Sequence, residues 1–181
     1  MFASDFRKQA RDFYQQKVAD VYEYYERELR KNNALDFDDL LLVAVKLLQS
    51  NAAVLDKYSK RFRYVMIDEY QDTNHAQYLL AYLLSSHWKN IAVVGDADQS
   101  IYAWRGADIQ NILDFEKDYP NCTSIKLEQN YRSTKIILDA ANAVIDHNEG
   151  RPEKNLWTDK VEGAKIQHFT AQSEHEEAAF I

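Results

Sequence analysis

The fold is decided at VMIDEYQD, residues 65–72, where a short apolar run ends in two acidic side chains. A second such run, IAVV at residues 91–94, ends in glycine and aspartate. Continuous apolar runs of this length are typical of strands buried on both faces of a parallel sheet. Between them, apolar residues recur at helical spacing over residues 78–83, and Thr73 or Asn74 can cap that helix. The segment therefore predicts a strand, helix, strand unit.

Upstream of this unit the sequence is helical in pattern. Apolar residues recur at steps of three, four or eight from Phe6 to Leu29, which predicts a helix that ends near KNN at residues 31–33. A second helix should begin near Asp36, whose carboxylate can accept a hydrogen bond from the backbone N–H of Asp39. We therefore expect the chain to be all-helical up to about Ser59.

Downstream, the strand and helix pattern continues. SIKL at residues 124–127 is predicted to form a third strand. Thr134 is expected to cap a helix from Lys135 to about His147. Strands that alternate with helices indicate an α/β fold with a parallel sheet and flanking helices, preceded here by an N-terminal helical segment.

The last part of the sequence is more polar. GRP at residues 150–152 begins a predicted polar loop, and KIQHF at residues 165–169 is expected to form a further strand. Ser173 and Glu176 form a capping box that opens another helix. The sequence ends within two turns of this start without a stop signal, which favours a cut polypeptide over a natural terminus.

Composition narrows the class of protein. The 181 residues are 46% hydrophobic and 28% charged, as in an ordinary globular protein. The net charge of −7 argues against a surface that binds nucleic acid as a whole, so any such contact must be local. Cys122 is the single cysteine, which excludes an internal disulfide and a cysteine-based metal site. No apolar run reaches the roughly 20 residues of a membrane span and no signal peptide is visible, so a cytoplasmic protein is expected.

The acidic pair after the first predicted strand has a chemical use. Ligands of open α/β sheets bind outside the carboxyl ends of the strands, where Asp68 and Glu69 would lie. Asp68 could hold Mg²⁺ directly or through water. Glu69 could orient or deprotonate the water that attacks a γ-phosphate. The alternative is that both are solvated acids at a strand end, and the pair alone does not decide between the two.

The second predicted strand leads into a polar loop and then aromatic residues. Gln99 could sense a terminal phosphate by hydrogen bonding. Tyr102, Trp104 and Arg105 are residue types that stack on unpaired bases and contact backbone phosphates. Large aromatic side chains more often belong to a core. Their position directly after a phosphate-facing loop favours base stacking instead.

The third predicted strand leads into LEQNYRST, residues 127–134. Tyr131 could stack on a purine ring, and Arg132 could stabilise charge that develops on a transferred phosphoryl group. The alternative is a helix-capping turn with a surface arginine, which the segment by itself favours.

Taken together, these segments resemble a known family. DEYQD at residues 68–72, GDADQSIYAWRGA at residues 95–107 and QNYRS at residues 129–133 resemble motifs II, III and IV of superfamily 1 DNA helicases of the bacterial UvrD/PcrA/Rep group. The likeness extends to LDFDDL at residues 35–40 and KNLWT at residues 154–158, so it covers nearly the whole chain.

The resemblance implies an ATP-dependent 3′ to 5′ DNA helicase that uses ATP and Mg²⁺ and acts on single-stranded DNA and duplex junctions. By this likeness, Asp68 binds Mg²⁺, Glu69 is the catalytic base, and Gln99 couples the γ-phosphate to the DNA-binding loop. Tyr131 stacks on adenine and Arg132 contacts the γ-phosphate.

The same resemblance implies a DNA track and a domain layout. The residues expected to contact single-stranded DNA are Phe37, Tyr102, Trp104 and Arg105. Residues 1–59 would be the tail of a helical subdomain (1B-like), residues 60–125 the C-terminal half of a first RecA-like domain (1A-like), and residues 126–181 the start of a second (2A-like). The implied fold is therefore part of a RecA-like P-loop NTPase.

One departure from the family is large. The sequence has no G-x-x-x-x-G-K-[ST] loop, and its four glycines are Gly95, Gly106, Gly150 and Gly163. We therefore expect the chain alone to be inactive as an ATPase. An alternative is a non-catalytic module that binds single-stranded DNA or docks a partner. A recombination helicase-nuclease ranks last, because no nuclease motif is visible.

Accessory proteins of DNA repair or replication are expected partners of such a helicase. A sheet that lacks its first strand exposes an edge, through which the chain could associate with a second copy.

Overall fold

The computed structural model of the chain describes residues 2–150 and 154–181. They form two compact units that separate after Asp118. Of the predicted polar loop at residues 150–152, Arg151 and Pro152 lie outside the described residues. None of the described helices is long and apolar enough to cross a membrane.

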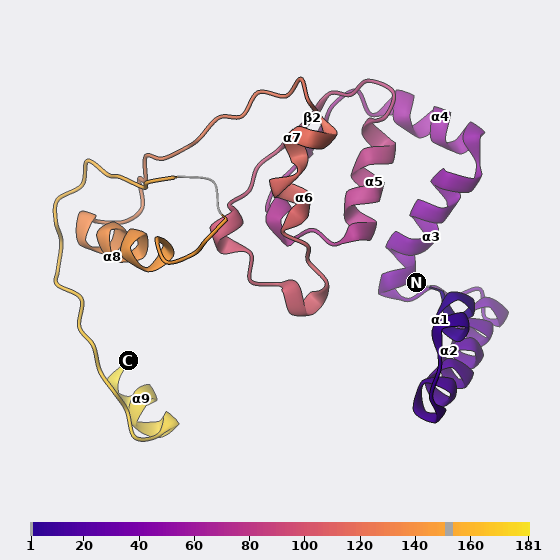
Figure 1. Cartoon of the computed structure of the whole chain (residues 1–181), viewed down its shortest axis with the longest axis horizontal. Helices are drawn as coiled ribbons and strands as arrows, with labels where there is room; N and C mark the ends of the chain where they lie inside the picture. The colour runs from indigo at the N-terminus through magenta and orange to yellow at the C-terminus, as the bar shows by residue number, and fades with distance from the viewer. Residues whose placement is uncertain (1, 151–153) are drawn as a thin grey trace. The chain divides into compact units, whose positions relative to one another are not determined.

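The first two helices of the first unit pack against each other. The predicted N-terminal helix is divided into α1 (Ala3–Gln9) and α2 (Phe13–Lys31) (Figure 1). The Arg7 guanidinium lies 2.7 Å from a carboxylate oxygen of Asp20 and 2.8 Å from one of Glu23. Hydrogen bonds from this guanidinium hold the pKa of each of these two carboxyl groups below its ordinary value.

Helices α3 (Phe37–Ser50) and α4 (Ala52–Arg61) follow and pack against a later helix, α5 (Figure 1). The predicted start of α3 is confirmed. Asp36 Oδ1 accepts a hydrogen bond from the backbone N–H of Asp39 at 2.8 Å, and Asp39 Oδ2 accepts one from the backbone N–H of Asp36 at 3.3 Å. This reciprocal pair satisfies backbone donors that the first turn of a helix cannot use.

The predicted strand, helix, strand unit is also confirmed. Strands β1 (Val65–Ile67) and β2 (Ile91–Val93) pair in parallel, and α5 (His75–Ser85) connects them. Asn74 caps α5, and its side chain and that of Gln77 form a reciprocal capping box. A parallel pair needs such a crossover connection, which the helix supplies.

The expectation that both faces of this sheet are buried is wrong. Val65 and Ile67 are half-buried, whereas Met66 between them is 77% exposed. Successive side chains of a strand point to opposite faces. In the part of the chain that the structure describes, one face of the sheet is therefore covered and the other is open.

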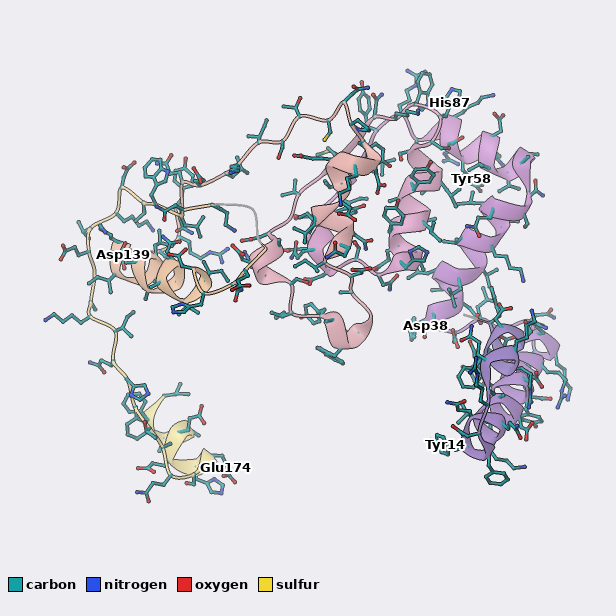
Figure 2. All side chains as sticks on the ribbon, in the orientation of Figure 1. Tyr14, Asp38, Tyr58, His87, Asp139 and Glu174 are labelled. Atoms are coloured by element: carbon teal, nitrogen blue, oxygen red, sulfur yellow. The ribbon has the colours of Figure 1, made fainter. Side chains whose placement is uncertain are left out.

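Short helical elements follow each strand, and the last of them ends the first unit. They are η1 (Tyr70–Asp72), η2 (Ala97–Gln99), η3 (Ala103–Arg105), α6 (Gln110–Leu113) and α7 (Phe115–Asp118). Figure 2 shows that many side chains of both units project into solvent, among them Tyr14 on α2, which is 77% exposed.

The best-buried side chains lie directly after β1. Tyr70 and Gln71 are each 1% exposed. The Tyr70 ring packs edge-on against Phe115 with 5.8 Å between ring centroids, and its backbone N–H donates to the carbonyl of Val94 at 3.0 Å. Gly95 makes this packing possible, because a Cβ there would lie 2.6 Å from Gln71 Oε1.

In the second unit, the predicted third strand at residues 124–127 is not formed. A single parallel bridge joins Gln129 to Trp157 instead. Its hydrogen bonds run from Asn130 N–H to the Trp157 carbonyl at 2.7 Å and from Trp157 N–H to the Glu128 carbonyl at 3.0 Å. A strand needs a partner along its length, and this pairing begins only after residue 127.

The predicted helix after Thr134 is confirmed as α8 (Lys135–Ile145), which ends slightly earlier than expected. The Thr134 side chain makes no capping hydrogen bond. The carbonyls of Val161 and Glu162 accept instead from the first two backbone N–H groups of the helix, at 3.4 and 3.2 Å. Tertiary contact therefore replaces the local cap.

The predicted strand at residues 165–169 is not formed either, since no strand pairs with it among the described residues. Helix α9 (Glu174–Phe180) begins where predicted, with Ser173 Oγ accepting from the Glu176 N–H at 3.3 Å. The Glu176 side chain does not complete a capping box, because it accepts from the N–H of Gln172 at 2.7 Å.

The contact between α1 and α2 should depend on pH. Because the pKa of Asp20 and that of Glu23 are lowered in the folded state, their contribution is present above about pH 4 and is lost as the pH falls through the folded pKa values. We expect amide chemical shifts of α1 to titrate in acid and to flatten in Arg7→Gln. Identical titrations in the two proteins would contradict the pairing.

A methyl group at Gly95 should destabilise the first unit. Its Cβ would meet Gln71 Oε1 at 2.6 Å and Ile112 Cδ1 at 2.9 Å, so Gly95→Ala should lower the free energy of unfolding by about 1–3 kcal/mol. Urea denaturation measures this. Gly106→Ala is the control, because φ there is 85° and an added Cβ would meet no atom of a non-adjacent residue within 4 Å. Only backbone strain of about 1 kcal/mol is expected for it. Unchanged stability of Gly95→Ala would contradict the packing.

Candidate functional site

The acidic pair lies where β1 ends. The Asp68 carboxylate is exposed, and its Oδ1 accepts a hydrogen bond from the backbone N–H of Glu69 at 2.9 Å. Glu69 has a φ of 51° in the left-handed region. Such a conformation is uncommon for a residue other than glycine and is found at sites where surrounding contacts hold it.

A buried side chain joins this strand end to the end of β2. Gln71 Nε2 donates to Glu69 Oε2 at 2.8 Å, and Gln71 Oε1 accepts from the backbone N–H of Asp96 at 3.0 Å. The backbone carbonyl of Gln71 accepts from the Ser100 hydroxyl at 3.2 Å. The two strand ends therefore share one buried amide group.

The loop after β2 is organised around Asp96. One carboxylate oxygen of Asp96 accepts from the backbone N–H of Asp98 at 3.0 Å, and the other accepts from Gln99 Nε2 at 2.8 Å. Gln99, the predicted phosphate sensor, is exposed. Hydrogen bonds thus run in sequence from Glu69 through Gln71 and Asp96 to Gln99.

The residues at this edge fit a magnesium ion better than a metal held by protein alone. No group of three or more His, Cys, Asp or Glu side chains could hold a metal among the residues that the structure describes. Mg²⁺ is usually held by one or two carboxylates together with waters and substrate phosphates. The exposed carboxylate of Asp68 is a group of this chemical kind. Nearby, the buried Oδ1 of Asp72 has no hydrogen-bond partner, although its Oδ2 lies 3.4 Å from Gln71 Nε2.

The aromatic residues after this loop lie on the surface. Trp104 is 75% exposed and Tyr102 is 38% exposed, with 6.4 Å between ring centroids. The Arg105 guanidinium lies 4.7 Å from the centroid of the Trp104 ring and 5.4 Å from that of the Tyr102 ring. A role in the core is therefore excluded for Trp104, and the cluster has the composition of a base-stacking surface.

Phe37, the remaining residue of the predicted DNA track, lies at the start of α3 and is 90% exposed. Within the described residues, no ring contact joins it to Tyr102 or Trp104. The structure therefore brings together three of the four predicted DNA-contacting residues and leaves Phe37 separate from them.

The predicted nucleotide-binding residues of the second unit stand at a turn before α8. Tyr131 is 75% exposed, and its hydroxyl donates to Gln129 Oε1 at 2.8 Å. The exposed Arg132 is held through its backbone, whose N–H donates to Asn130 Oδ1 at 2.9 Å. Its carbonyl accepts from Lys160 Nζ at 2.8 Å. These two hydrogen bonds fix the turn through the backbone and leave the guanidinium exposed.

Sequence reasoning missed two residues of the first unit. Gln71 and Asp96 lie within the motifs, but residue type and spacing predict no role for them. The available signal was a glutamine two residues after Glu69 in an otherwise bulky or acidic segment, and a glycine directly before Asp96. Neither signal reveals that Gln71 and Asp96 contact each other, because the hydrogen bond between them spans 25 positions.

Each of the two units matches the model of a known protein family. Residues 2–120 match the family described as UvrD/REP helicase N-terminal domain. Residues 125–181 match the family described as UvrD-like helicase C-terminal domain.

Similar proteins carry the corresponding names. The chain is 55% identical over 178 residues to the ATP-dependent DNA helicase PcrA of Staphylococcus aureus, and 55% identical over 177 residues to those of Leuconostoc citreum and Staphylococcus epidermidis. In each case the match covers 98% of this chain and 24% of the relative, so the chain spans about a quarter of their length. The chain therefore belongs to the UvrD/REP helicase family.

Proposed function

We propose that this chain is the central part of an ATP-dependent 3′ to 5′ DNA helicase that translocates on single-stranded DNA and unwinds duplexes. The observation that carries the proposal is the run of hydrogen bonds from Glu69 to Gln99, which ends three residues before Tyr102. In this proposal, the edge at Glu69 faces the nucleotide and the surface that begins at Tyr102 faces DNA. The direction of movement rests on the likeness to the family.

The residues at the strand ends fit ATP hydrolysis. Asp68 would hold Mg²⁺, which neutralises charge on the β- and γ-phosphates when bound. Glu69 would accept a proton from the attacking water, because its carboxylate is held beside the strand end by the Gln71 amide. Gln99 would exchange its bond with Asp96 for one with the γ-phosphate. By the likeness to the family, Tyr131 would stack on adenine and Arg132 would stabilise phosphoryl charge.

The surface at Tyr102, Trp104 and Arg105 would hold single-stranded DNA. Aromatic rings accept any base by stacking, and a guanidinium binds phosphate, so such a surface binds without sequence preference. The protein's charge of −7 is consistent with contact through a local surface. Phe37 would contribute a further ring to the track. Duplex junctions and repair or replication accessory proteins complete the proposed partners, and the cytoplasm is the proposed location.

The proposed domain layout follows the family likeness. Residues 1–59 would belong to a helical subdomain, residues 60–125 to a first RecA-like domain and residues 126–181 to a second. The phosphate-binding loop that such a motor requires is not in this sequence. In this proposal that loop lies in another part of a longer protein.

A second candidate function is a non-catalytic module that binds single-stranded DNA or docks a partner. The exposed Trp104 favours it. It differs from the first proposal in requiring no ATP at any stage.

The 181-residue chain alone should not hydrolyse ATP. Catalysis of phosphoryl transfer depends on positioning and charge stabilisation, and the loop lysine and its backbone N–H groups are missing. A phosphate-release assay with Mg²⁺ and single-stranded DNA should show no turnover above background. Turnover that disappears in Glu69→Gln would refute this expectation.

Trp104→Ala should weaken binding of single-stranded DNA by about 5- to 150-fold, the equivalent of one lost base stack. Fluorescence anisotropy of a labelled oligonucleotide measures the affinity. Phe13→Ala is the matched control, because Phe13 is also 75% exposed and also has a cation, Lys17, near its ring. Equal affinities for the two variants would count against the proposed DNA surface, and ATP-independent binding would favour the second candidate.

A further inference from the structure

We propose that Gln71 is a positioning residue that fixes the Glu69 carboxylate and the loop at residues 96–100 in one arrangement. The inference rests on the proposed role of Glu69 and extends it to a residue whose side chain is buried, with 1% exposed. Its basis is the geometry of a buried side chain that uses both ends of its amide.

The orientation of the amide is determined by its partners. A carboxylate only accepts hydrogen bonds and a backbone N–H only donates. Gln71 Nε2 must therefore face Glu69 Oε2, at 2.8 Å, and Oε1 must face the Asp96 N–H, at 3.0 Å. Reversing the amide would lose both bonds and place like atoms in contact. Gln71 consequently has one productive orientation.

The surroundings leave this side chain little room to move. Gln71 is 1% exposed, and the position of a Cβ on Gly95 lies 2.6 Å from Gln71 Oε1. Close-packed buried side chains keep one rotamer, so the amide acts as a rigid link. A rigid link transmits a displacement of one partner to the other.

The two hydrogen bonds of Gln71 hold groups on both of its partners, Glu69 and Asp96, in place. Glu69 adopts a left-handed conformation, with φ at 51°, which persists only when neighbouring contacts stabilise it. At the other end, the Asp96 carboxylate accepts from Gln99 Nε2. Movement of Gln99 toward a phosphate would therefore act on Asp96, then on Gln71, and then on the carboxylate of Glu69.

The first test measures the link itself in the 181-residue chain. Gln71→Met has a side chain of similar length without hydrogen-bonding groups. Gln71→Glu replaces the amide donor with a buried carboxyl group that faces the Glu69 carboxylate, so it breaks the contact with Glu69. Hydrogen exchange of the Asp96 amide should be about tenfold faster in Gln71→Met than in the wild type. Unchanged exchange in Gln71→Met would overturn the proposal.

Gln110→Met is the matched control for this measurement. The exposed Gln110 side chain on α6 takes no part in the link, so the same substitution there should leave exchange of the Asp96 amide unchanged. Faster exchange in the control would show a general loss of stability instead of a lost contact, and would count against the proposal.

The second test measures catalysis in the protein expressed with its flanking coding sequence. Both Gln71 variants should lower kcat for DNA-stimulated ATP hydrolysis by on the order of 10²-fold, the cost of misplacing a reacting group by about 1 Å. The KM for ATP should change less than about twofold, because the buried Gln71 side chain is proposed to act through Glu69 and not on the nucleotide itself. A purely structural role would instead lower the amount of active protein and would leave kcat per active site unchanged.

Glu69→Gln separates failure of this inference from failure of the proposed function. If Glu69→Gln hydrolyses ATP at the wild-type rate, Glu69 is not the base and the proposed function fails. If Glu69→Gln is inactive while both Gln71 variants keep the wild-type kcat, the proposed function stands and the positioning role of Gln71 is refuted.

Discussion

Parallel pairing of β1 with β2 determines where the polar groups that directly follow these two strands lie. The pairing is extended at its two ends by backbone hydrogen bonds from Val65 N–H to the Asn90 carbonyl and from Val94 N–H to the Ile67 carbonyl, at 2.9 and 2.8 Å. Because the strands run in the same direction, the chain leaves both at the same edge. Glu69 and Asp96 meet there through a shared amide. The acidic pair, the Asp96 loop and the exposed rings thus occur in one region for a topological reason.

The local parts of this fold were predictable from the sequence. Caps at Asp36 and Asn74 involve residues three positions apart, so the sequence contains both partners side by side. The predicted strands at residues 124–127 and 165–169 failed because a strand depends on a partner that is distant in sequence. Without that partner the apolar side chains Ile125 and Ile166 are 77% and 60% exposed. The same limit explains Met66, since an apolar run does not reveal whether both faces of its sheet are covered.

The candidate site likewise has a part that the sequence predicts and a part that it does not. Glu69, Gln99 and Trp104 could be singled out by residue type and by their position after an apolar run, and their proposed roles came from the likeness to a family. The link through Gln71 could not be foreseen, because its partner Asp96 is 25 positions away. A glutamine in a motif is ordinarily assigned to solvent or ligand. Here burial to 1% exposure, which only coordinates reveal, gives the residue its importance.

The position of Arg105 beside two aromatic rings affects the affinity for DNA that the proposed function requires. The guanidinium of Arg105 already lies against the rings of Trp104 and Tyr102, so part of the stacking surface is occupied by the protein's own cation. A nucleobase that stacks on this surface competes with that contact, and the energy it gains is the difference between two attractive interactions. When the base leaves, the guanidinium can return to the rings. Under the proposed function, such an exchange would lower the barrier to the release of each nucleotide in turn.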